Sequence, residues 1–290
     1  MTKRILSFLT ALFLLFLSGC SLSEKPAQIA ATTLPVYEFT SRLCAGTGIT
    51  VTRLVTENIS CLHDYSLNVA QVRAAEAAQL IVISGAGLED FMADLLSGKE
   101  CIDSSTGIAA LKCGDSHEHD HGHHHETDAH IWLSPENAKI MAQNIFAGLC
   151  AQYPQYKATF QTNLNTLLAD LDALQQYGES QLASLSCQEL ITFHDGFGYL
   201  AHAFDLHILQ AIEEESGSEA SAAELKHLIT EVREHNLPAV FTEINGSVSA
   251  ADIIAAETGV RIFPLDMAMS GDSYFSAMYH NIDTLKEALE

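Results

Sequence analysis

The chain alternates short apolar, β-rich runs with longer helical patterns, and this rhythm occurs twice, before and after a middle section. Such alternation indicates βαβ units, in which helices join strands that pair in parallel. We therefore predict an α/β fold with two similar halves, each a parallel sheet flanked by helices. The predicted strands are 28–33, 49–55, 80–84, 189–193, 207–212, 239–242 and 261–263, and the predicted helices include 36–44, 69–78, 197–204 and 221–235.

One long periodic segment, 154–185, separates the two halves. Phe160, Leu164 and Leu167 begin a series of apolar residues at helical spacing, and no proline follows the first residue of the segment. A single helix of about thirty residues would be about 45 Å long. It would join the halves rigidly, unlike the flexible crossovers of receptors that close by a hinge. Two shorter helices broken at Gly178 are the alternative.

Length and composition agree with two lobes. At about 100 to 200 residues per domain, 290 residues make two domains, and a hydrophobic fraction of 48% is enough for a substantial core. The net charge of −23 argues against nucleic-acid binding, which needs clustered Lys and Arg. We divide the chain into a leader (1–20), an N-terminal lobe (21–153) that includes a histidine-rich loop (115–127), a linking helix (154–186) and a C-terminal lobe (187–290).

The first twenty residues have the layout of an export signal. Lys3 and Arg4 precede an apolar run, 5–17, which is too short to cross the roughly 30 Å hydrocarbon core. Residues 17–20, Leu-Ser-Gly-Cys, resemble the bacterial lipobox, so we expect Cys20 to carry lipid. The chain would then be anchored on the outer face of the cytoplasmic membrane, the periplasmic side in a Gram-negative cell. An ordinary secretory peptide with an incidental cysteine is the alternative.

Export changes the interpretation of the other cysteines, because disulfides persist outside the cytoplasm. Six cysteines remain and allow fifteen pairings, none of which the sequence dictates. Cys101 with Cys113 is the most local pairing, and we also predict Cys44 with Cys61 and Cys150 with Cys187. A thiolate zinc cluster has little support, since the chain contains no Cys-x-x-Cys. The six are Cys44, Cys61, Cys101, Cys113, Cys150 and Cys187.

Residues 117–125 read His-Glu-His-Asp-His-Gly-His-His-His. The tract has no apolar residue to bury, and histidines at this density typically bind borderline metals such as zinc. A solvated loop without a metal role is one alternative, and an engineered tag is another. We predict an auxiliary metal loop formed by His117, His119, His121, His123, His124 and His125.

Four isolated residues are better candidates for a fixed metal site: His63, His130, His194 and Asp266. At least three of them fall near the carboxyl ends of predicted strands, where ligands collect in open parallel sheets. His130 lies close to the only tryptophan, Trp132. Two of the four come from each half, so a metal ion in the cleft would be held by both lobes. For the remaining isolated histidines we expect ordinary surface or core roles.

In this order and spacing, the motifs resemble those of the zinc and manganese receptors of bacterial ABC importers. The similarity covers the lipobox, His-Asp-Tyr, the histidine-rich loop before His-x-Trp-Leu-Ser-Pro, Phe-His-Asp-Gly-Phe-Gly-Tyr and the Leu-Asp near the end. The resemblance implies two α/β lobes with four-stranded parallel sheets joined by one long helix, a single metal site between them and delivery to a membrane permease. It implies that His63, His130, His194 and Asp266 are the ligands, and that the tract is the loop of zinc-preferring members.

Three imidazoles and a carboxylate suit tetrahedral Zn²⁺, whereas Mn²⁺ favours more oxygen ligands. We therefore predict a monomeric zinc receptor rather than an enzyme, with Asp64, Asp195 and Glu243 as candidate partners of the ligand imidazoles. A manganese receptor is the first alternative. Others are a metal-sequestering adhesin or storage protein, and a secreted zinc hydrolase, although no His-Glu-x-x-His is present. Small lobe shifts are expected on release, because the linking helix is stiff.

Overall fold

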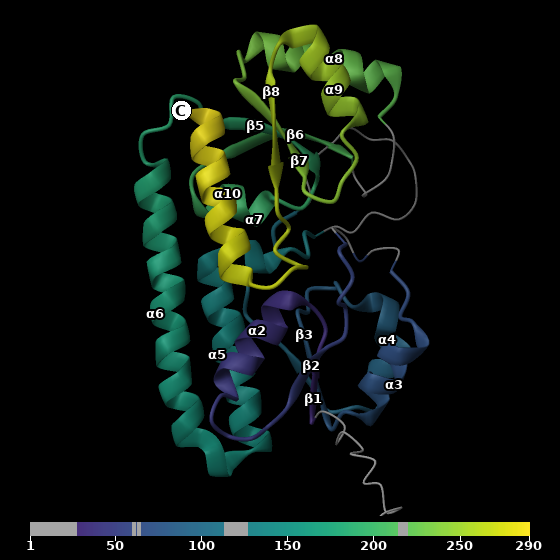
Figure 1. Cartoon of the computed structure of the whole chain (residues 1–290), viewed down its shortest axis with the longest axis vertical. Helices are drawn as coiled ribbons and strands as arrows, with labels where there is room; N and C mark the ends of the chain where they lie inside the picture. Colours follow the sequence, from purple (N-terminus) through teal and green to yellow (C-terminus); the bar gives the residue numbers. More distant parts are fainter. Residues whose placement is uncertain (1–27, 60–61, 63–64, 113–126, 214–219) are drawn as a thin grey trace, which may run out of the picture.

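The structure is a computed structural model that describes residues 28–59, 62, 65–112, 127–213 and 220–290. It contains two four-stranded sheets, stacked one above the other along the long axis of the molecule (Figure 1). We call the part with the first sheet, residues 28–153, the N-lobe and the part with the second sheet, residues 187–290, the C-lobe. The predicted leader, with Cys20, lies outside the described residues.

Four parallel strands form the N-lobe sheet in the order β2-β1-β3-β4. Three of them lie within predicted strands. The sequence pattern does not predict β4, because only Ile102 of its three residues is buried and no apolar run marks it. The bounds are β1 Ile29–Ala31, β2 Val51–Arg53, β3 Leu80–Ile83 and β4 Cys101–Asp103.

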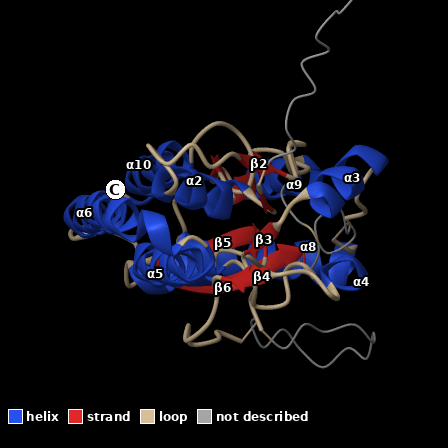
Figure 2. Cartoon of the chain, turned by 90° about the horizontal axis from the view of Figure 1, so that it is seen from below, coloured by secondary structure: helices blue, strands red, loops and turns tan. Residues whose placement is uncertain are grey.

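Helices flank the N-lobe sheet on both sides, with α3 and α4 on one side and α2 and α5 on the other (Figure 2). Two of these helices begin at N-terminal caps. Asn68 and Gln71 form a capping box at α3, and the Ser134 side chain caps α5, which has Pro135 in its first turn. The bounds are α2 Leu34–Leu43, α3 Val69–Ala77, α4 Ala93–Leu96 and α5 Pro135–Gln152.

The C-lobe sheet repeats this arrangement in the order β6-β5-β7-β8, again with parallel strands. All four strands are predicted, and each extends one or two residues past its predicted end. The predicted capping box of Ser221 and Glu224 begins α8. The bounds are β5 Glu189–His194, α7 Gly198–Ala203, β6 His207–Glu213, α8 Ala222–Glu234, β7 Ala239–Glu243, α9 Ser249–Thr258, β8 Arg261–Leu265 and α10 Tyr274–Leu289.

One long helix, α6 (Lys157–Leu182), runs beside both lobes and confirms the predicted rigid connection (Figure 1). Its 26 residues continue through Gly178 without a break. The glycine serves packing here, because a Cβ at this position would lie 2.2 Å from Cε1 of Phe204. The two-helix alternative is therefore wrong. Together with the two sheets, α6 confirms the predicted fold class.

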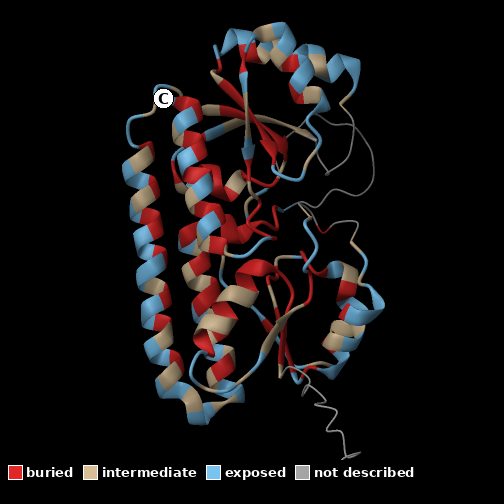
Figure 3. Cartoon of the chain, in the orientation of Figure 1, coloured by how far each residue is buried: buried red, intermediate tan, exposed pale blue. Residues whose placement is uncertain are grey.

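The two lobes share one hydrophobic core. Buried residues of α6, among them Leu167 and Leu171, lie on its side that faces α5 and α10 (Figure 3). They belong to a cluster that includes Val82 of β3 in the N-lobe and Phe241 of β7 in the C-lobe. Wide separation of the lobes would expose this apolar surface at a cost of about 25 cal/mol per Å². The fold therefore favours small lobe shifts over hinge opening.

A tyrosine hydroxyl also joins the lobes on the side of α7. Tyr199 Oη accepts a hydrogen bond from the Leu111 backbone N–H at 3.0 Å and lies 3.2 Å from the Ala109 carbonyl, to which it donates. Tyr199 is 3% exposed. This contact holds the N-lobe segment that precedes the histidine-rich tract against the C-lobe.

Cys150 and Cys187 are free thiols, so their predicted disulfide is wrong. The two residues lie beyond opposite ends of α6, whose 26 residues span about 39 Å, while a disulfide needs Cα atoms within about 7 Å. The predicted partners of Cys44 and Cys101 are Cys61 and Cys113, which lie outside the described residues, so these two pairings stay predictions. Cys44 itself is part of the shared core, where burial raises the pKa of its thiol to about 12.

Among the described residues, no helix combines the length and the apolar character needed to cross a membrane.

Candidate metal centre

His130 lies in the loop before α5 and is 2% exposed. Oδ1 of Asp128 accepts two hydrogen bonds from His130, one from the backbone N–H and one from Nδ1, each at 2.8 Å. Because the acceptor is a carboxylate, Nδ1 carries the proton, which leaves the lone pair of Nε2 available for a cation. The sequence alone does not indicate this role for Asp128. The only sequence signal is a carboxylate two residues before a histidine.

His194 is the last residue of β5, one residue past the predicted end of that strand, and is 2% exposed. Its Nδ1 lies 3.6 Å from Oε1 of Glu243, the last residue of the neighbouring strand β7. Glu243 therefore lies beside the imidazole of His194, one of the histidines that it is predicted to support. Two residues later, Gly196 allows the chain to turn close to the ring, because a Cβ there would lie 2.5 Å from His194 Cδ2.

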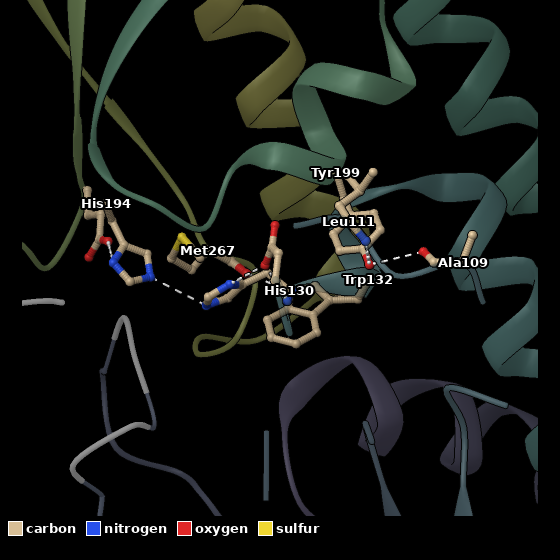
Figure 4. A network of polar contacts seen from close by, with 9 residues as sticks. Ala109, Leu111, His130, Trp132, His194, Tyr199 and Met267 are labelled. Atoms are coloured by element: carbon tan, nitrogen blue, oxygen red, sulfur yellow. Dashed lines mark hydrogen bonds and ion pairs between the residues drawn. The ribbon is translucent and has the colours of Figure 1, made fainter. Parts of the chain in front are cut away.

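The two imidazoles face each other across the lobe boundary (Figure 4). Their Nε2 atoms are 3.4 Å apart, and the ring planes are at 89°. Tetrahedral zinc with bonds of about 2.0 to 2.1 Å places two nitrogen ligands about 3.3 Å apart. The observed spacing therefore matches that of two imidazoles on one zinc ion.

Asp266 follows β8 directly, and the amide of Asn281 on α10 holds its backbone. Asn281 Oδ1 accepts from the Asp266 N–H and Asn281 Nδ2 donates to the Asp266 carbonyl, both at 2.7 Å. The Asp266 carboxylate accepts a hydrogen bond from the Ala268 N–H at 2.8 Å. Burial raises the pKa of this carboxyl group, against the lowering effects of the Ala268 bond and of His280.

The structure thus brings together two of the four predicted ligands, His130 and His194. Within the described residues, no group of three or more His, Cys, Asp or Glu side chains is placed to hold a metal ion. His63 lies outside the described residues, and so does Asp64, which is predicted to support it. The same holds for the whole auxiliary loop: His117, His119, His121, His123, His124 and His125.

Comparison with known proteins agrees with this geometry. Residues 29–288 match the family described as zinc-uptake complex component A, periplasmic. The zinc-binding lipoprotein AdcA of Streptococcus pneumoniae is 30% identical over 99% of this chain, which spans 61% of the length of AdcA. The crystal structure of ZnuA has a TM-score of 0.80 at 29% identity and covers 91% of this chain and 100% of its own.

A zinc-bound relative has the same fold. The Zn(II)-bound ZnuA-like domain of Streptococcus pneumoniae AdcA has a TM-score of 0.76 at 27% identity, covering 90% of this chain and 98% of that domain. These matches confirm the resemblance to the zinc-uptake family that the motifs indicate. The chain belongs to the family of periplasmic zinc-uptake complex component A proteins.

Proposed function

We propose that this chain is an extracytoplasmic, lipid-anchored receptor that captures Zn²⁺ and delivers it to the permease of an ABC-type metal importer. Family membership and the zinc-binding relative AdcA support capture of zinc outside the cytoplasm. The lipobox at residues 17–20 supports an anchor at Cys20. A receptor that holds a single ion between its lobes does not itself carry the ion across a membrane. Uptake therefore requires delivery of the ion to a permease.

The pair of His130 and His194 carries the proposal. Its Nε2 atoms are 3.4 Å apart, and each Nδ1 faces a buried carboxylate. A carboxylate behind a ligand imidazole fixes its tautomer and makes it a stronger base toward the metal. We assign the two further ligands to His63 and Asp266. For Asp266 this requires its carboxylate to turn from the Ala268 N–H toward the ion.

The ligand set favours zinc over manganese. Three imidazole nitrogens and one carboxylate oxygen satisfy tetrahedral zinc, whereas manganese prefers more oxygen ligands in a larger shell. The histidine-rich tract 117–125 would raise the local concentration of zinc near the site without forming part of it. Because the lobes share a core, release on docking would involve local movement of ligands and small lobe shifts.

Metal stoichiometry and a zinc titration followed by Trp132 fluorescence test the proposal. We expect one tightly bound zinc ion per chain, with weaker ions that disappear when 115–127 is deleted. Replacement of His194 by alanine should weaken tight binding by about 100-fold, since four ligands share roughly 10 to 16 kcal/mol of binding free energy. His202→Ala is the matched control, because this histidine is exposed on α7, just after β5.

Three results would contradict the proposal. Equal zinc affinity of the parent and His194→Ala would rule out the assigned site. Preference for manganese in a competition titration would favour a manganese receptor. Normal growth of a deletion strain under zinc starvation, with retained zinc binding by the protein, would favour sequestration or adhesion over uptake.

A further inference from the structure

The segment from the end of β8 to the first residue of α10, residues 266–274, belongs to the C-lobe in sequence but is held by the N-lobe. It begins at the proposed ligand Asp266. Three of its carbonyl groups, at every second residue, accept hydrogen bonds from N-lobe donors. These are Trp132 Nε1 to Met267 O at 2.8 Å, Leu34 N to Met269 O at 3.4 Å and Arg53 Nη1 to Gly271 O at 2.8 Å.

The far end of the segment is held by the N-lobe as well. Glu38 on α2 accepts a hydrogen bond from the Tyr274 backbone N–H at 2.6 Å and lies 3.5 Å from Ser273 Oγ. Ser273 is the N-cap of α10. Contacts with the N-lobe therefore recur from the residue next to Asp266 to the first residue of α10.

Trp132 contacts both ends of the segment and also His130, one of the two paired histidines. Its indole N–H binds the Met267 carbonyl, and its own carbonyl accepts a hydrogen bond from Tyr274 Oη at 2.8 Å. The indole ring lies 5.4 Å from the His130 ring, measured between centroids (Figure 4). Trp132 and Tyr274 are both 0% exposed, so water does not compete for these bonds.

We propose that Trp132, locked by the Tyr274 hydroxyl, is a positioning residue that sets the distance between His130 and Asp266. The inference rests on the proposed zinc site. Asn281 holds the peptide groups on either side of Asp266 from the C-lobe, and Trp132 holds the next carbonyl from the N-lobe. A small lobe shift would therefore move Asp266 relative to the histidine pair and loosen the ion. This couples the lobe interface to metal release.

A purely structural role for Trp132 would change stability and leave the metal geometry alone. Tyr274→Phe separates the two roles, because it removes one hydroxyl and keeps the ring that packs edge-to-face on Phe39 at 5.0 Å. Tyr199→Phe is the matched control: it removes another buried hydroxyl that joins the lobes, but on the side of α7. Trp132→Phe removes the indole N–H itself.

The test uses full-length exported protein loaded with zinc or with cobalt. Zinc dissociation is measured with a chromophoric chelator, and cobalt absorption reports the coordination geometry. We expect Tyr274→Phe and Trp132→Phe to release zinc about tenfold faster and to shift the cobalt spectrum toward that of Asp266→Asn. Tyr199→Phe should match the parent in both measurements. In the Asp266→Asn background, Tyr274→Phe should have no further effect on dissociation, because the two changes act through the same ligand.

An unchanged cobalt spectrum and dissociation rate in Tyr274→Phe would overturn the inference, and so would equal effects of Tyr274→Phe and Tyr199→Phe. Failure of the parent to bind one tight zinc ion would instead overturn the proposed function.

Discussion

The N-lobe and C-lobe halves of the histidine pair are supported differently. On the N-lobe side, a single oxygen of Asp128 accepts two hydrogen bonds from His130, each at 2.8 Å. On the C-lobe side, Glu243 lies 3.6 Å from Nδ1 of His194, beyond ordinary hydrogen-bond distance. Both carboxylates are 5% exposed, so burial does not explain the difference.

From this difference we expect a division of labour, in which one histidine of the pair is held fixed and the other is adjustable. His130 is fixed in tautomer and orientation before a metal ion arrives, because its backbone and its ring are tied to the same carboxylate. We predict that Glu243 moves closer to Nδ1 of His194 when an ion binds, because 3.6 Å is longer than an ordinary hydrogen bond. In the proposed site, one ligand would be fixed and the other adjustable, so binding would not need lobe closure, which agrees with the shared core.

The largest expected effect comes from removing the fixed support. Asp128→Ala should weaken zinc binding by about 10- to 100-fold, the range typical of lost partners behind metal ligands. Glu243→Ala should weaken it by less than about tenfold, because its contact with His194 is longer. Competition with a chelator of known affinity measures both constants.

Asp128→Asn is the conservative variant, since the amide oxygen can still accept from the backbone N–H and Nδ1 of His130. It should retain more affinity than Asp128→Ala. Equal losses for Asp128→Ala and Glu243→Ala would show that the two halves are supported alike and would remove the proposed division of labour.

A smaller effect is expected from disturbing the packing behind each half. Gly178→Ala on α6 would place a Cβ 2.2 Å from Phe204 at the end of α7, the helix that follows His194. Overpacking against this rigid ring should lower the free energy of unfolding by about 1 to 3 kcal/mol. The higher helix propensity of alanine should offset about 1 kcal/mol of this loss. Zinc affinity should change by less than about threefold, because the C-lobe half can adjust. Urea unfolding and zinc titration measure the two quantities.

Gly148→Ala on α5 is the matched change in the N-lobe. Its Cβ would lie 2.4 Å from Cδ1 and 2.5 Å from Cγ1 of Ile102, an aliphatic side chain on the edge strand β4 that can adjust more easily than the Phe204 ring. We therefore expect a smaller loss of stability than for Gly178→Ala. A loss of zinc affinity in Gly178→Ala as large as that in Asp128→Ala would contradict an adjustable C-lobe half.

Much of this architecture follows from local sequence patterns. The apolar run before His194 predicts β5, and the leucine spacing from Phe160 onward predicts α6 as one helix. The strand β4 is not predictable in this way, because Cys101 and Asp103 on either side of Ile102 are exposed. Such a strand depends on pairing with β3, which is a tertiary interaction.

The metal centre shows the same limit. The positions of His130 and His194 can be inferred from motifs, because each lies in a short recognisable run of residues. Glu243 behind His194 can also be inferred, but the contacts of Asp128 and Trp132 cannot, since they depend on how the backbone turns at Asp128 and on a contact with Met267, 135 residues from Trp132 in sequence. No periodicity or local spacing encodes a hydrogen bond of that kind.

The smallest expected effect concerns the start of the strand that carries His194. Glu189, the first residue of β5, lies 2.8 Å from Nδ1 of His235, and this hydrogen bond raises the pKa of the imidazole above 6.5, with Glu231 and Glu234 adding to the effect. A raised pKa in the folded state contributes stability that is fully present below pH 6.5 and is lost as the pH rises through the folded pKa. Because the pair is exposed and screened by solvent and salt, the contribution should be small. The unfolding temperature of His235→Ala should therefore differ from that of the parent only slightly at pH 5.5 and not at pH 8.5. At each pH, the variant and the parent should have equal zinc affinity. A larger difference at pH 8.5 than at pH 5.5 would contradict this sign, and a change in zinc affinity would show that the support of His194 extends the whole length of β5.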